Sequence, residues 1–163
     1  MNDPVSKDAA EPAVARCPEC GAPWPAGRTC SDDFHQLLAW EFEDPRRWEV
    51  HHLTVLCYHI QHPSLYSPGG LHGATELLGQ FLEQRLSTEE VRRRIRRQVD
   101  SGKRSGPITA RPGAEGAYAH PVAWPMTAAQ VVAGGAAAYC DNVRAWAEST
   151  LAALKASGNL AAP

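Results

Sequence analysis

Cys17 and Cys20, in the stretch CPECG, constrain the fold of this chain more than any other feature of the sequence. Two thiolates separated by two residues can hold one metal ion from a tight turn, and Cys30 can supply a third thiolate. Pro18 restricts the turn, and Gly21 can adopt the left-handed conformation that points backbone N–H groups at the sulfurs. The spacing therefore predicts a metal site in the N-terminal part of the chain.

Zinc is the ion that this ligand chemistry favours. Thiolate ligands combined with an imidazole suit Zn²⁺ better than iron. Residues 17–30 contain almost no large apolar side chain beyond Trp24, so this lobe needs another source of folding energy. Structural zinc supplies about 10–16 kcal/mol in small peptides. The alternative is that the three cysteines are ordinary thiols in a loop.

A tetrahedral site needs a fourth ligand, and the sequence offers two candidates. His35 lies close to the cysteines in sequence, while His51 opens the histidine-rich stretch VHHLTVLCYHIQHP and would tie the lobe to a neighbouring helix. In a helix, His51 and His62 are separated by about 16 Å along the axis. Because zinc bonds are about 2 Å long, one ion cannot bind both rings.

His62 and His72 support a different interpretation, that of a catalytic centre. His62 ends the histidine-rich helix before Pro63, and the turn that follows can bring His72 close to it. Together with Tyr58, the two histidines are candidates for a metal- or histidine-dependent enzyme site. The alternative is that His62 caps the helix and His72 bonds to backbone. Motifs for paired carboxylates, a nucleophile elbow or a phosphate loop do not occur.

Apolar periodicity predicts a mainly α fold, an irregular helical bundle with a small N-terminal cysteine-rich zinc lobe. The sequence favours a disordered tail at 1–16 and a single zinc-binding helical domain at 17–158, divided into the zinc lobe 17–30 and the helical body 31–158. The helices are expected at about 31–43, 45–61, 71–86, 87–99 and 127–156, with a long loop at 101–126 and a break near Gly134 and Gly135.

Positive charge gathers in one segment of the chain. Between Val91 and Arg104 there are seven basic residues and one acid, although the whole chain has a net charge of −2. The Arg92–Arg104 face could bind an acidic partner or a nucleic acid, or it could be a solvated helix face with internal ion pairs. Nucleic-acid binding is the less favoured interpretation, because no aromatic residues interleave the arginines.

Composition places the chain among ordinary globular proteins. Apolar residues make up 44% and charged residues 21%. No apolar run is long enough for a membrane span, and the N-terminus lacks the pattern of an export signal. Five cysteines without an export signal indicate a reducing, cytoplasmic setting. Partners and oligomeric state are left open by the sequence.

The segments CPECG, LLAWEFEDP, VHHLTVLCYHIQHPS and WPMTAAQVV together resemble DUF5946, a bacterial family of uncharacterised proteins, over about residues 17–155. The resemblance implies that Cys17, Cys20, Cys30, His51 and His62 are motif positions and that a histidine near His72 recurs. It favours His51 over His35 as the fourth ligand, and it implies no reaction.

We therefore predict a zinc-binding helical protein of unknown biochemical activity, with zinc held by Cys17, Cys20, Cys30 and His51. A closed site with four protein ligands leaves no position for water, which favours a structural role for the metal over a catalytic one.

Overall fold

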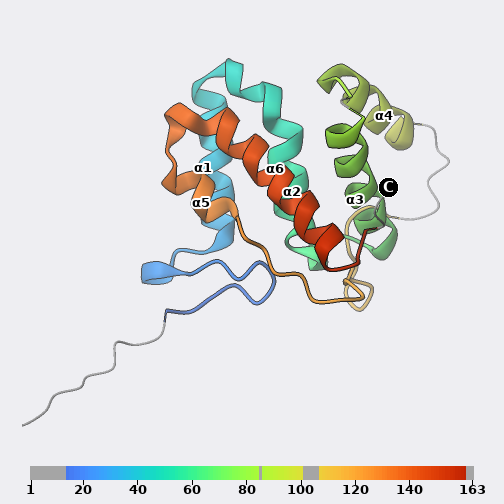
Figure 1. The fold of residues 1–163 in the computed structure, drawn as a ribbon, viewed down its shortest axis with the longest axis horizontal. Coiled ribbons are helices and arrows are strands. Elements are labelled where there is room, and N and C mark those ends of the chain that lie inside the picture. The colour runs from blue at the N-terminus through green and yellow to red at the C-terminus, as the bar shows by residue number, and fades with distance from the viewer. Residues whose placement is uncertain (1–13, 85, 101–106, 161–163) are drawn as a thin grey trace, which may run out of the picture.

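The computed structural model describes residues 14–84, 86–100 and 107–160, and it confirms a mainly α fold (Figure 1). The α-helices are α1 (Cys30–Glu43), α2 (His51–Ile60), α3 (Pro68–Glu83), α4 (Thr88–Asp100), α5 (Ala128–Ala133) and α6 (Tyr139–Ala156). The 3₁₀ segments are η1 (Pro25–Gly27), η2 (Pro45–Val50), η3 (Pro63–Leu65) and η4 (Ala136–Ala138). The described residues form no strand, only isolated bridges at Arg16–Pro23 and Tyr66–Thr109.

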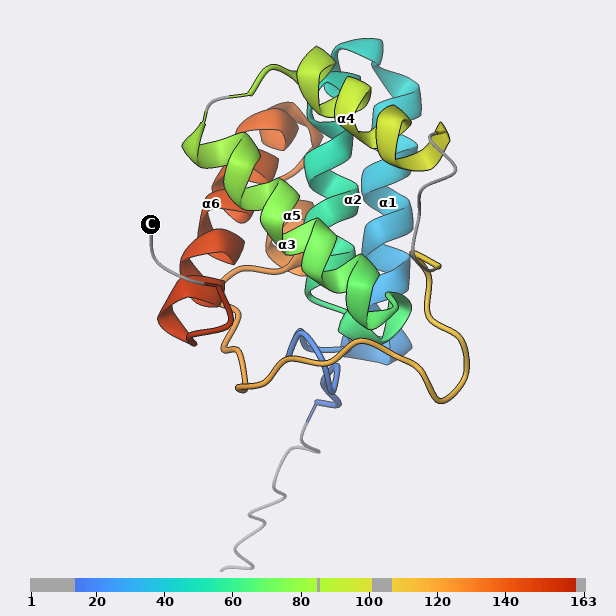
Figure 2. The same ribbon diagram turned by 90° about the vertical axis from the view of Figure 1, so that its right-hand side faces the viewer.

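Helix α2 is the central element of the body. It packs against α1, α3 and α6, while α5 packs against α1 and α6. Both ribbon views place the N-terminal segment at one end of the helical body and α4 at the other end (Figures 1 and 2). The side chains with no exposed surface lie between these helices and include Leu37, Cys57, Ile60, Leu78, Val131, Val143, Trp146 and Leu154.

Capping residues set where the first two helices begin. Thr29 is the N-cap of α1, and its side chain forms a capping box with Asp32. The sequence pattern also predicted a helix that starts after Asp44 and runs to Gln61, and this prediction is only partly correct. The side chain of Asp44 does cap the segment, but Pro45–Val50 is a 3₁₀ helix and the α-helix begins at His51.

The C-terminal half follows the expected order. Residues 107–126 contain no helix, and the predicted loop positions 101–106 lie outside the described residues. Thr127 and Gln130 form the predicted capping box at the start of α5. The break falls at Gly134 and Gly135, as predicted, because Gly135 has a φ of 79° that strongly favours glycine.

Residues 1–13 of the predicted tail lie outside the described residues, and the division into one tail and one domain stays a prediction. Ala15 and Arg16 already pair with the cysteine lobe: Arg16 bridges to Pro23, and the backbone N–H of Trp24 donates to the carbonyl of Ala15 at 2.7 Å. None of the described helices is long and apolar enough to cross a membrane.

Candidate metal centre

Three thiols and one imidazole converge at the N-terminal end of the molecule. The sulfurs of Cys17, Cys20 and Cys30 and a ring nitrogen of His62 all lie within 4.8 Å of one another. All four residues are buried, with exposed fractions of 7% or less. Their side chains come from segments up to 45 residues apart in the chain, so the cluster is a product of the tertiary fold.

The backbone turn after Cys17 places the first two sulfurs. The N–H of Gly21 donates to the carbonyl of Cys17 at 3.0 Å, and the N–H of Cys17 donates to the carbonyl of Ala22 at 2.9 Å. Gly21 has a φ of 73°, in the left-handed region that favours glycine. The N–H of Cys20 points back at the Cys17 sulfur, 3.5 Å away. The CPECG turn therefore has the conformation that its sequence predicts.

Cys30 and His62 enter the cluster from helix ends. Cys30 is the first residue of α1, so its sulfur lies at the positive end of the helix dipole, which favours a thiolate. His62 follows the last turn of α2 and precedes Pro63. The fold thus brings the start of α1 and the end of α2 close to the CPECG turn.

Hydrogen bonding fixes which nitrogen of His62 faces the sulfurs. The Nδ1 atom lies 2.6 Å from the carbonyl oxygen of Tyr58, and only an N–H can donate there. The Nε2 atom, 3.6 Å from the sulfur of Cys17, therefore carries the free lone pair. Burial lowers the pKa of His62, which favours the neutral ring that a metal requires. A histidine with one nitrogen anchored to a carbonyl is the usual arrangement of a metal ligand.

Two further side chains support the cluster from outside. The indole N–H of Trp24 donates to the sulfur of Cys30 at 3.2 Å. The carboxylate of Glu19, inside the CPECG turn, accepts from the backbone N–H and the hydroxyl of Ser64, both at 3.0 Å. Because Ser64 lies two residues after His62, Glu19 holds the cysteine turn against the end of α2.

The environment of the thiols disfavours the thiolate form unless a cation lies close to it. Burial is the largest cause that raises the pKa of both Cys20 and Cys30, and the nearby Cys17 thiol raises both further. A buried thiolate is unfavourable without a positive charge close to it. A bound metal ion deprotonates coordinating thiols outright, so these buried sulfurs are suited to an ion and poorly suited to remain free anions.

Two of the separations lie near those that a tetrahedral metal ion would need. With Zn–S bonds of about 2.3 Å and Zn–N bonds of about 2.0 Å, tetrahedral geometry puts sulfurs roughly 3.8 Å apart and a sulfur and nitrogen roughly 3.5 Å apart. The observed Cys17–His62 separation is 3.6 Å, and the sulfurs of Cys20 and Cys30 are 3.3 Å apart. Small side-chain adjustments therefore suffice to bind an ion.

The structure places the expected fourth ligand elsewhere. The Nδ1 atom of His51 lies 2.6 Å from a carboxylate oxygen of Glu41, and its ring packs against Trp48. His35 is exposed on α1. Neither residue belongs to the thiol cluster, so the expectation of His51, with His35 as the alternative, does not match the arrangement. The fourth side chain of the cluster is that of His62, because the CPECG turn packs against the C-terminal end of α2 and not against the end that carries His51.

The suggested catalytic group does not assemble around one cleft. His62 is directed at the thiols, and His72 has a side chain that is 73% exposed, with its nearest charged partner Glu76 on the same helix at 3.5 Å. Burial raises the pKa of Tyr58 to about 12, so its hydroxyl is a poor acid or base near neutral pH. The geometry therefore gives no support to a catalytic site formed by Tyr58, His62 and His72.

Glu41 is a residue whose importance sequence reasoning missed. Its carboxylate is 1% exposed and accepts a hydrogen bond from the hydroxyl of Tyr139 at 2.5 Å, in addition to its contact with His51. The Tyr139 hydroxyl also lies 2.7 Å from that of Thr54. One signal was available, since Glu41 occupies a position on the apolar stripe of α1, where an acidic residue needs a buried partner.

Fold and site together define a mainly α protein with a buried cluster of three cysteines and one histidine. The chain belongs to the family of unknown function DUF5946, whose model matches residues 15–155. No curated protein and no solved structure gives a significant match to the chain.

Proposed function

We propose that the protein binds one zinc ion through Cys17, Cys20, Cys30 and His62, and that this zinc has a structural role. The observation that carries the proposal is the convergence of four buried ligand atoms within 4.8 Å. Three thiolates and an imidazole form one of the standard ligand sets of structural zinc sites. Soft sulfur ligands disfavour magnesium and calcium, which take oxygen.

A structural role follows from the number and origin of the ligands. Four protein ligands complete a tetrahedral shell and leave no position for a water molecule or a substrate. The ligands join three segments, namely the CPECG turn, the first residue of α1 and the residue after Gln61. Apart from Trp24, residues 17–30 supply no large apolar side chain to hold the lobe in place. The ion therefore fastens the lobe to the helical body.

Metal analysis of the purified protein tests the proposal directly. We expect one zinc per chain in the wild type by mass spectrometry of the acid-digested protein, and less than a tenth of that in Cys20→Ser and His62→Ala. Matched controls are Cys140→Ser and His51→Ala, which remove the same side-chain types outside the cluster. Both controls should retain full zinc content.

Two outcomes would contradict the assignment. If His51→Ala loses zinc while His62→Ala retains it, the fourth ligand is wrong. If zinc is absent from protein that circular dichroism shows to be folded, and added zinc does not raise its melting temperature, the structural role is wrong. With the role as proposed, a chelator should lower the melting temperature of the wild type but leave that of folded Cys20→Ser unchanged.

A further inference from the structure

Helix α4 uses its arginines unequally. Arg94 faces the body, where it donates to the side-chain oxygen of Gln80 at 2.7 Å and lies 3.4 Å from Glu90. Arg93 pairs with the same Glu90. Arg92, Arg96 and Arg97 are exposed and form no ion pair with any described side chain. Arg94 thus anchors the helix and Arg93 is held by an ion pair on α4 itself, while Arg92, Arg96 and Arg97 remain available to a ligand.

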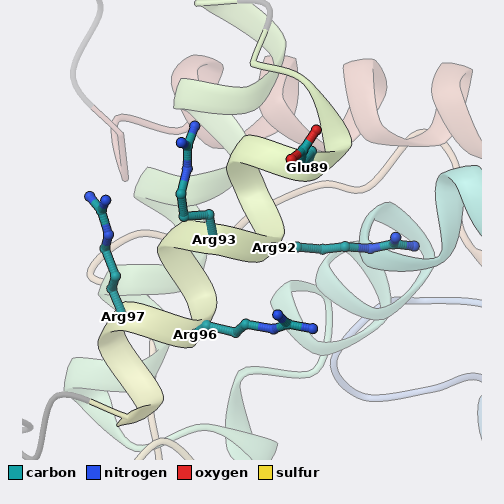
Figure 3. Close-up of a pocket in the computed structure, with 5 residues that line it drawn as sticks. All are labelled: Glu89, Arg92, Arg93, Arg96 and Arg97. Carbon is teal, nitrogen blue, oxygen red and sulfur yellow. The ribbon is translucent and has the colours of Figure 1, made fainter.

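These three side chains border a shallow hollow on α4. It is lined by Arg92, Arg93, Arg96, Arg97 and Glu89. In Figure 3, Arg92 and Arg96 extend side by side toward one flank of the helix, and Arg93 and Arg97 extend toward another flank. We call the four arginines the α4 arginine surface.

The spacing within this surface concentrates like charge. Residues four apart on a helix are neighbours separated by about 6 Å along the axis. The pairs Arg92–Arg96 and Arg93–Arg97 therefore hold guanidinium groups beside each other, which costs helix stability unless an anion lies between them. Among the described residues, α4 has few close backbone contacts with the other helices.

We infer that the α4 arginine surface binds the phosphodiester backbone of a nucleic acid, independently of its sequence. The planar guanidinium group matches a phosphate with two parallel hydrogen bonds. A duplex carries about one phosphate charge for every 1.7 Å of its axis, so arginines paired at about 6 Å along α4 can reach separate phosphates of the same duplex. The inference rests on α4 alone and is independent of the proposed zinc site, which lies at the opposite end of the molecule (Figure 2).

The residues of the α4 arginine surface favour a nucleic acid over a membrane surface or a protein partner. A helix that binds a membrane surface inserts large apolar side chains beside its basic ones, and a protein interface has an apolar core. None of the described side chains that line the hollow is apolar, since four arginines and one glutamate line it. It also lacks the amides and aromatic rings that read or stack bases, so contacts are limited to phosphates.

Binding should be strongly dependent on salt, because phosphate contacts release counterions. For four contacts, affinity should fall roughly 100-fold between 50 and 200 mM NaCl. We would measure fluorescence anisotropy of a labelled 20-base-pair duplex and of a single strand of the same length, both of mixed sequence. We expect binding of at least one of them at 50 mM NaCl, and the two probes decide which form of nucleic acid is preferred.

Variants locate the contact. Arg92→Gln/Arg96→Gln should weaken binding and reduce the slope of log affinity against log salt by about 2. The control is Arg46→Gln/Arg144→Gln, which removes the same charge from two exposed arginines outside α4 and should leave binding unchanged. If the first variant does not fold, Arg92→Lys/Arg96→Lys keeps the charge but removes the planar fork, and should bind more weakly than the wild type.

Three results would overturn the inference. The first is that neither nucleic acid binds at 50 mM NaCl at protein concentrations up to about 50 µM. The second is that the α4 variant and the control variant lose equal affinity. The third is that the protein binds vesicles containing phosphatidylserine but not nucleic acid. Zinc content should be the same in all variants, so a failure here leaves the metal assignment untouched.

Discussion

Replacement of the buried Glu41 by alanine should destabilise the helical body strongly. The carboxylate of Glu41 is 1% exposed and joins three helices, because it accepts from Tyr139 of α6 at 2.5 Å and lies 2.6 Å from His51 of α2. Alanine removes both contacts and leaves space where the side chain was. The hydroxyl of Tyr139 retains Thr54 as a partner, whereas the ring nitrogen of His51 must turn to water.

The expected cost follows from these two contacts. A hydrogen bond to a carboxylate contributes about 1.5–3 kcal/mol, and the cavity left by truncation of a buried side chain adds to the loss. We therefore expect Glu41→Ala to lower the free energy of unfolding by about 3–5 kcal/mol. Glu41→Gln keeps the volume and the acceptor for Tyr139, and should cost about 1–2 kcal/mol.

Urea unfolding at pH 7.5, followed by circular dichroism with the same excess of zinc in every sample, measures these differences. The matched control is Glu43→Ala, on the same helix, whose side chain is 63% exposed and which should change stability by less than about 0.5 kcal/mol. A loss of 3–5 kcal/mol corresponds to a fall in melting temperature of about 6–20 °C. If Glu41→Ala and Glu43→Ala differ by less than about 1 kcal/mol, the carboxylate does not join the helices as described.

Two further variants test single contacts. Trp24→Phe removes the indole N–H that donates to the sulfur of Cys30, and should weaken zinc affinity about 10-fold in competition with a chelator, whereas Trp124→Phe should not. His52 packs edge-on against Phe81, and both its ring nitrogens are buried without a partner among the described residues. Burial lowers its pKa to about 4, below the unfolded value of 6.5, so the folded state loses stability as the pH falls from 6.5 toward 4. Discounted for partial exposure, the loss is about 1–2 kcal/mol. His52→Leu should abolish that part of the pH dependence and stabilise the protein at pH 7; an unchanged pH profile in urea unfolding would contradict this.

Local chemistry explains why the three thiols were predictable from the sequence. Two cysteines separated by two residues, with a proline and a glycine in the turn, produce the same short-range geometry in many folds. Cys30 follows closely enough that only its short loop and the start of α1 need to fold correctly. The capping boxes at Thr29 and Thr127 form over three residues in the same way.

The fourth side chain was not predictable because it depends on long-range packing. His51 and His62 lie at opposite ends of α2. The sequence alone does not show which of these two ends packs against the cysteine lobe. The contact between Glu19 and Ser64 and the position of α1 beside α2 place the lobe at the end of α2 that carries His62. No periodicity in the sequence encodes that choice.

Apolar periodicity also has a physical limit, which α1 illustrates. The stripe through Phe34, Leu37, Leu38, Glu41 and Phe42 predicts burial by position alone. In the structure the acid on this stripe is fully buried, while Phe42 is 76% exposed and rests edge-on against Trp48. Burial of Glu41 is tolerated because two polar groups from other helices meet it. A charged residue on an apolar stripe therefore indicates a buried polar contact, whose partners only the fold identifies.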